Sequence, residues 1–158
     1  MIPGVLLAAV EVESDPIAYG LKGHSFHIAW RGATTRFDLG DYGIQYPKEK
    51  QNPGYVVTMK GRGFKLDFMG SSANGWFWGL EGGVAHLNFK RSAQEANRKV
   101  THGGLRFGYR FGEHGFYLVP WFGLDRYQID QPSPNLGGQS YQFRQWQPFP
   151  TVHLGYSF

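Results

Sequence analysis

One serine, two histidines and two acids in this sequence are of the types that hydrolyse esters. Ser25 and His27 are two residues apart, so on an extended strand both side chains point to the same face. In serine hydrolases a histidine accepts the proton of the serine, and an acid orients the histidine. Glu13, His102 and Asp125 are the candidate partners of the pair. If the fold brings these five residues to a similar height, the sequence predicts an esterase site.

A second set of charged residues is dispersed among glycines and contains both signs. Its members are Glu11, Lys65, Asp67, Glu81, Arg106 and Arg110. Charged groups removed from water are stable only when they are paired, so the set predicts a buried ion network with a structural role. Glu81 and Arg106 are predicted to meet, because their segments are neighbours and both residues lie near mid-segment. The same face also carries Glu13, His27, Arg31, Arg36, Asp38, His102, Asp125 and His153.

A third set is basic and falls in the segment 90–99, which reads as a polar connection. Against the single Glu95 it contains four cations, Lys90, Arg91, Arg98 and Lys99. Such a run is usually a solvated loop, but at an outer surface it would suit the phosphates of lipopolysaccharide. The six histidines are scattered and the chain has no cysteine, so neither a metal site nor a cofactor is predicted.

The elements that must position these residues are separated by turn-rich breaks of two alternating lengths. Short breaks lie at 31–34, 71–75 and 112–115, and longer ones at 14–23, 46–54, 90–99 and 130–138. Between them are eight segments with strand character: 4–13, 24–31, 34–45, 55–70, 75–89, 100–111, 116–129 and 141–158. The first could also be a short amphipathic helix. Alternating long and short connections predict an all-β, eight-stranded antiparallel up-and-down transmembrane β-barrel in one domain, 1–158.

Composition agrees with strands and narrows the function classes. The chain has 158 residues, 23 of them glycine, with 17% aromatic and 18% charged residues. No run of about 18 apolar residues is present, which excludes a helical membrane protein. The net charge of +4 is scattered, so no nucleic-acid partner is predicted. "MIPGVLLAAVEVE" lacks the features of a signal peptide, which suggests a mature form restarted with Met1.

Every second residue of the predicted strands is large and apolar, and the other face holds glycine and charges. If the apolar face pointed inward, as in a soluble lipocalin-like barrel, so many aromatic side chains would overfill an eight-stranded lumen. The reverse arrangement, apolar side chains against lipid, is therefore predicted. The residues expected to face lipid include Phe64, Leu105, Phe107, Phe122 and Leu154. The expected interfacial girdle is Trp30, Trp76, Trp78, Tyr109 and Tyr117.

The chain ends in "TVHLGYSF", with Tyr156 and Phe158 on the apolar face of an alternating strand. This ending resembles the carboxy-terminal assembly signal of bacterial outer-membrane barrels, although His153 stands where glycine is usual. In architecture the whole chain resembles the class of small eight-stranded outer-membrane barrels. Lipid A deacylases are barrels of this size that use serine, histidine and acid, but their local His-x-Ser arrangement is not reproduced by "GHSFH" (23–27).

These expectations lead to one preferred function and three alternatives. The preferred function is that of an integral protein of the bacterial outer membrane with a charged, plugged lumen. Its role would be structural, surface-binding or that of a partner in a larger envelope assembly, and its partners would be outer-membrane lipid and lipopolysaccharide. The alternatives are a lipid A deacylase-like esterase built on Ser25 and His27, a narrow transport channel, and a soluble lipocalin-like barrel.

Overall fold

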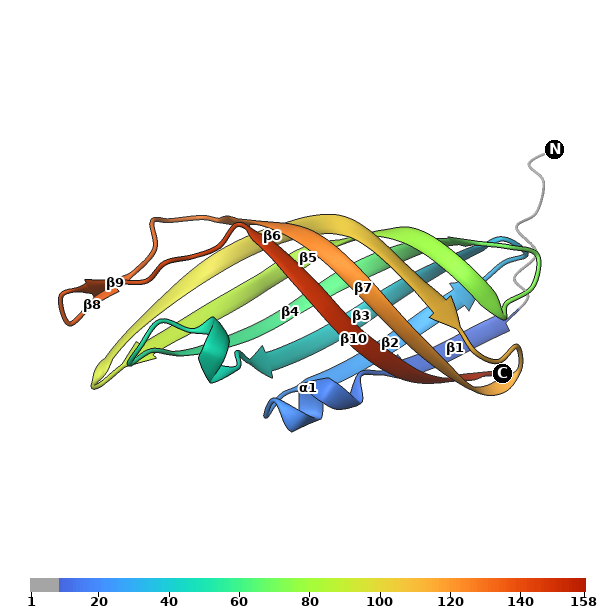
Figure 1. Ribbon diagram of the computed structural model, residues 1–158, viewed down its shortest axis with the longest axis horizontal. Coiled ribbons are helices and arrows are strands. Elements are labelled where there is room, and N and C mark those ends of the chain that lie inside the picture. Colours follow the sequence, from blue (N-terminus) through green and yellow to red (C-terminus); the bar gives the residue numbers. More distant parts are fainter. Residues whose placement is uncertain (1–8) are drawn as a thin grey trace.

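The computed structural model describes residues 9–158 and shows a closed antiparallel barrel of eight strands (Figure 1). The strands of the barrel are β1 (Ala9–Ser14), β2 (His24–Arg31), β3 (Thr35–Gln45), β4 (Val56–Met69), β5 (Gly75–Arg91), β6 (Gln94–Arg110), β7 (Gly115–Ile129) and β10 (Trp146–Ser157). Around the barrel their order is β1-β10-β7-β6-β5-β4-β3-β2. The other elements are α1 (Pro16–Gly20), η1 (Lys48–Lys50), β8 (Asn135–Leu136) and β9 (Gln139–Ser140).

The two ends of the barrel differ as predicted. In Figure 1 the chain end Phe158 and the connections β2–β3, β4–β5 and β6–β7 lie at one end, and α1, η1 and the β8–β9 hairpin lie toward the other. The short β6–β7 turn needs two glycines with positive φ, Gly112 at 109° and Gly115 at 68°. The predicted all-β barrel with short turns at one end is therefore confirmed.

Most strand boundaries agree with the sequence to within two residues, and two predicted segments need correction. The segment 90–99 is not a loop, because β5 and β6 continue to Arg91 and Gln94 and form one long hairpin. The last strand begins at Trp146 and not at 141, because 130–145 contains β8 and β9. The described part of the first segment is strand from Ala9, and 4–8 lies outside the described residues.

A belt of large apolar side chains covers the outside of the barrel. Trp76 is 63% exposed and Leu105 is 61% exposed. The five residues predicted to face lipid are all exposed: Phe64, Leu105, Phe107, Phe122 and Leu154. A soluble barrel would bury these side chains, so the outward orientation of the apolar face is confirmed. Among the described residues, no helix is long and apolar enough to cross a membrane.

Tyr117 is an error in the predicted girdle. Its side chain points into the barrel and is 4% exposed. There its hydroxyl donates to Glu11 Oε2 at 3.2 Å, and its ring lies 3.5 Å from the guanidinium carbon of Arg110. The alternation of β7 places Tyr117 with the inward residues, and its phenol is satisfied by the ion network.

The polarity of the two faces reverses along β4, β5 and β6. On the first part of β5 the outward side chains are Trp76, Trp78 and Leu80, whereas farther along they are His86, Asn88 and Lys90. Over the same distance the inward side chains change from Glu81 to Ala85, Leu87 and Phe89. The inward apolar residues form one buried cluster with Tyr46, Tyr55, Val57, Met59, Val100, Tyr127, Leu136 and Tyr141. The barrel thus has an ionic interior behind the apolar belt and an apolar interior behind a polar surface.

Candidate functional site

The ionic interior is the most elaborate site in the fold, and glycines make the room for it. A Cβ on Gly155 would lie 2.3 Å from the Tyr117 ring, and one on Gly40 would lie 2.2 Å from the His27 ring. Both distances are shorter than real Cβ contacts allow, so only glycine fits beside these rings. The glycine-rich inward face seen in the sequence therefore gives space to bulky polar side chains.

Glu11 lies at the centre of the ionic interior. It is fully buried and accepts hydrogen bonds from three arginines: Arg31 Nε at 3.0 Å, Arg36 Nε at 2.8 Å and Arg110 Nη1 at 2.9 Å. Arg110 is on β6, which is not a neighbour of β1 in the barrel, so this pair spans the lumen. One carboxylate thus binds arginines from three other strands, and buried charges of this kind are stable only as a complete set.

Arg36 extends the network across the lumen. Its Nη2 lies 2.8 Å from Glu13 Oε1 and 3.1 Å from Asp38 Oδ2, and its Nη1 lies 3.4 Å from Asp67 Oδ2. Asp67 Oδ1 lies 3.3 Å from Nε of Arg106. Four carboxylates, counting Glu11, therefore surround the single guanidinium of Arg36.

The predicted pair of Glu81 and Arg106 is not formed. Arg106 is paired with Asp67, and its guanidinium carbon lies 4.2 Å from the ring centroid of Trp121. Glu81 makes no ion pair within 4.0 Å among residues 9–158, and its Oε1 is buried without a hydrogen-bond partner. The register explains the difference, because Arg106 is directly opposite Gly79 on β5 while Glu81 is opposite Gly104.

Beyond the arginines, toward the apolar interior, three histidines are each held by one carboxylate. His27 Nδ1 lies 2.8 Å from Asp38 Oδ1, His153 Nδ1 lies 2.9 Å from Glu13 Oε2, and His102 Nδ1 lies 2.8 Å from Asp125 Oδ2. Lys65 extends between two of these pairs, with Nζ 3.2 Å from His27 Nδ1 and 3.5 Å from His153 Nδ1. Each carboxylate fixes a ring orientation, as a catalytic acid would, but here the same contacts also complete the ion network.

The five esterase candidates are all inward-facing, but the structure does not assemble them. Ser25 Oγ accepts a hydrogen bond from the backbone N–H of Asp15 at 3.1 Å and makes no hydrogen bond with His27. His102 and Asp125 do form an oriented pair, yet the other ring nitrogen of His102 lies 2.6 Å from the hydroxyl of Tyr42. Among the described residues, no serine stands where a nucleophile is needed, within hydrogen-bond distance of the oriented histidine.

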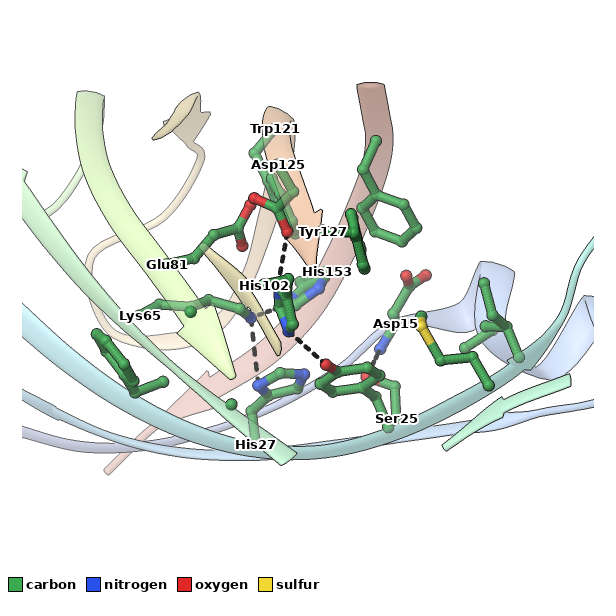
Figure 2. Close-up of a pocket in the computed structure, with 18 residues that line it drawn as sticks. Asp15, Ser25, His27, Lys65, Glu81, His102, Trp121, Asp125, Tyr127 and His153 are labelled. Carbon is green, nitrogen blue, oxygen red and sulfur yellow. Dashed lines mark hydrogen bonds and ion pairs between the residues drawn. The ribbon is translucent and has the colours of Figure 1, made fainter. Parts of the chain in front are cut away.

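A cavity of about 80 Å³ lies between the ionic and the apolar interior (Figure 2). Several of the residues that line the cavity are ionisable, including His27, Lys65, Glu81, His102 and Asp125. The accessible part of the wall is nevertheless mostly carbon, because the nitrogen atoms of Lys65 and the histidines are turned toward their partners. By the usual measure, about 10–15 Å³ for each water, the cavity has room for several water molecules.

The four basic residues predicted as a loop cluster lie on the extended β5–β6 hairpin, and three of them are already engaged. Lys90 lies 3.5 Å from Glu95, Arg91 donates to the carbonyl of Leu136 at 2.7 Å, and Arg98 donates to the carbonyl of Pro132 at 3.0 Å. Arg91 and Arg98 therefore hold the 130–145 connection against the hairpin.

A different basic row, which the sequence reading missed, faces outward just beyond the apolar belt. Lys60 is directly opposite His86, and His86 is directly opposite Lys99. All three side chains are exposed, and neither lysine has an ion-pair partner within the described chain. Cations opposite one another repel unless an anion lies between them. Counting outward residues across neighbouring strands would have found this row.

No group of three or more histidine and acidic side chains in the part described could hold a metal ion.

No family model and no curated protein matches the chain. Two solved structures are similar to it over almost their whole length. The N-terminal β-barrel domain of Pseudomonas aeruginosa OprF is 14% identical, with a TM-score of 0.53 and coverage of 96% of this chain and 98% of that one.

The second is a major outer membrane protein from Thermus thermophilus, 11% identical, with a TM-score of 0.54 and coverage of 95% of this chain and 98% of that one. At these identities the likeness concerns the fold. The chain therefore has the fold of the small outer-membrane β-barrels, as its exposed apolar belt and its eight closed strands also require.

Proposed function

We propose that this chain is an integral protein of the bacterial outer membrane whose lumen is closed by the ion network and whose role is structural and surface-binding. The observation that carries the proposal is the combination of an apolar belt outside with paired buried charges inside. Only a lipid surrounding gives the belt a favourable environment, and backbone polar groups at that depth must be satisfied within the protein. The fold of the two similar structures supports the same location.

The contacts across the lumen argue against a channel. Glu11 joins Arg110, Arg106 joins Asp67, and Tyr42 joins His102, in each case between strands that are not adjacent. An eight-stranded barrel has little space beyond its side chains, so we expect these contacts to interrupt any continuous aqueous path. We expect no discrete conductance when the protein is inserted into planar bilayers.

The membrane location is tested by extraction and gel migration. The protein is expected in the outer-membrane fraction, soluble only with detergent, and more mobile on gels before heating than after it. A protein that stays monodisperse in buffer without detergent would contradict the proposal. Lipid A should have the same acyl chains with and without expression, and an acyl chain lost in a His102-dependent manner would instead make the barrel an esterase.

The row of Lys60, His86 and Lys99 supports lipopolysaccharide phosphate as the bound partner. It stands on the outside, immediately beyond the belt. In the proposed location this is the level of the lipid headgroups. Each exposed lysine near an anionic surface contributes about 1 kcal/mol, or roughly a fivefold change in affinity. The variants Lys60→Gln and Lys99→Gln should therefore each weaken binding of phosphorylated lipid A to the detergent-solubilised protein.

Lys90→Gln is the matched control for these variants, because Lys90 is on the same hairpin but is paired with Glu95. Lipid A without phosphates is the matched ligand control. The expected loss of affinity disappears with the dephosphorylated lipid and becomes smaller at high salt, because the interaction is electrostatic. Equal effects of Lys60→Gln and Lys90→Gln would remove the row from the proposal.

A further inference from the structure

The wall of the barrel has a gap between β2 and β10 that backbone pairing does not close. β10 is paired with β7 along its whole length, from Trp146 to Ser157, but with β1 only from Leu154 to Ser157. β1 ends at Ser14, where the chain turns into α1. The part of β10 before Leu154 therefore has an edge without a neighbouring strand, and the short helix α1 contacts this strand. Figure 1 shows α1 on this side of the barrel wall.

The free edge of β10 has few backbone N–H groups with which another strand could pair. Phe158 donates its backbone N–H to Val10 on β1, so the even-numbered residues of this regularly paired strand direct their backbone groups toward the gap. Two of these residues, Pro148 and Pro150, have no N–H to donate. Proline at an edge strand removes the donors that a further strand would bind and that lipid would leave unsatisfied.

The opposite edge, on β2, is also satisfied without a strand. The carbonyl of Ser25 accepts hydrogen bonds from the hydroxyls of Ser14 at 2.6 Å and Tyr19 at 3.1 Å. The Ser25 hydroxyl accepts the backbone N–H of Asp15. No backbone ladder joins the two edges of the gap, and among the printed side-chain contacts they are linked through Asp15, which bonds Ser25 on β2 and Thr151 on β10.

α1 is a small cover of five residues, and a hydrogen bond from the Gln45 N–H to the carbonyl of Leu21 holds its end against β3. Its Ala18 is buried on the inner side, while Ile17 and Tyr19 are exposed on the outer side. Its N-cap residue Asp15 accepts a hydrogen bond from Thr151 Oγ1 on β10 at 2.6 Å. The outer side of the cover is therefore apolar and tethered at its beginning, as expected for a segment that borders lipid.

The internal cavity lies directly behind this gap. Its lining includes Asp15 and Ala18 from the cover, Ser25 from the β2 edge and Phe149 from the β10 edge (Figure 2). Outside the gap, Pro148 and Pro150 are opposite Leu124 and Phe122 of the apolar belt. α1 therefore stands between the belt and the cavity.

We propose that the gap between β2 and β10 is a lateral binding site in which the end of a membrane-lipid acyl chain passes beneath α1 into the cavity. The proposal rests on the membrane location proposed above. An acyl chain is the occupant because the gap opens within the apolar belt and the accessible cavity wall is mostly carbon. The cavity is too small for a complete chain, so only its terminal methylenes enter unless α1 moves outward.

Fluorescence quenching by brominated acyl chains tests the proposal, because Trp121 lines the cavity and is 6% exposed. A variant that keeps only this tryptophan is made by changing the other four to Phe: Trp30, Trp76, Trp78 and Trp146. In vesicles of brominated phosphatidylcholine, Trp121 should be quenched. The chain has no cysteine, so Asp15→Cys with Thr151→Cys gives one defined disulfide that locks the cover.

The locked and reduced forms of this double variant differ only in the freedom of α1. Loss of Trp121 quenching on oxidation, and its return on reduction, supports the lateral site. Equal quenching in both forms overturns it, and so does a Trp121 that is never quenched while Trp76 and Trp78 of the native chain are. If those outer tryptophans are not quenched either, the proposed membrane location fails together with the site.

Two single variants keep the test decisive if the cysteine pair disturbs folding. Thr151→Val removes the tether to Asp15 with little change of shape and should increase the quenching of Trp121. Ala18→Phe fills the space beneath the cover and should decrease it. A water-soluble quencher, acrylamide, distinguishes the route: if acrylamide quenches Trp121 and brominated lipid does not, the cavity opens to water and the proposal is wrong.

Discussion

The interior of this barrel consists of two regions that solve the same packing problem in opposite ways. Behind the apolar belt, Glu11, Arg36 and Arg110 form a core made of ion pairs. Farther along the barrel, Leu87 and Phe89 form a core of hydrocarbon. The difference follows the surroundings: where the outside is apolar, the inside carries the charges, and where the outside is polar, the inside is apolar. Because successive residues of a strand point to opposite faces, each region can place charges on one face of the wall and apolar side chains on the other.

The largest effect is expected in the ionic region. Glu11→Gln leaves three arginines without their shared carboxylate and should reduce the free energy of unfolding by about 3–5 kcal/mol. Urea unfolding in detergent micelles, followed by tryptophan fluorescence, measures the change. Asp41→Asn is the control, since Asp41 is an exposed carboxylate paired with His24 and Arg62, and its loss should amount to about 0–1 kcal/mol. Similar losses for the two variants would show that the interior charges are hydrated.

In the hydrocarbon region, Leu87→Ala should reduce the free energy of unfolding by about 2–5 kcal/mol, because it leaves a cavity among fully buried side chains. The same unfolding experiment applies. Asn88→Ala, one residue farther along and outside, is the control and should stay within about 0.5 kcal/mol. If Leu87→Ala were as mild as its control, this end of the barrel would not have a packed core.

The boundary between the regions is tested by placing the same charge on the outer face at two heights. Leu105→Arg lies in the belt and should destabilise the folded protein by about 2–4 kcal/mol if the belt is in lipid. Asn97→Arg lies on the same strand and the same face, in the polar part beyond the belt, and should change little. Folding into lipid vesicles, assayed by gel migration before and after heating, compares them. Tolerance of both substitutions would place the belt in water.

The smallest effect concerns which charges meet. A double-mutant cycle of Asp67→Asn and Arg106→Gln should show a coupling of about 0.5–3 kcal/mol, because the two groups are 3.3 Å apart. The cycle of Glu81→Gln with Arg106→Gln should show a smaller coupling, because Glu81 is not an ion-pair partner of Arg106. A larger coupling in the second cycle would restore the pairing expected from the sequence.

Much of the fold could be predicted because its signals are local. The segment 24–31 is a strand with the predicted bounds, and Phe64 and Leu105 point outward as the alternation indicates. The hairpin at 90–99 was missed because its polar residues look like a loop, whereas they are the outer face of strands that have left the belt. The reversed alternation after Val84 was readable in the sequence and marks the same change.

Two features of the interior were decided by the tertiary structure alone. The sequence predicts Glu81 and Arg106 as partners from their places in neighbouring segments, but the register sets them apart and brings Asp67 to Arg106. The candidates Ser25 and His27 share a face but not a hydrogen bond, because the Ser25 hydroxyl is bound to the backbone of Asp15.

By itself, the sequence determined the number of strands, their inward and outward faces and the ionic nature of one part of the lumen, because an alternation of period two is written residue by residue. Which charges meet across the lumen, and where the wall is left unpaired beside Pro148 and Pro150, depends on the closure of the barrel. A barrel closes only when the registers of all its strand pairs are compatible with one another. This combined condition cannot be read from the type of any single residue.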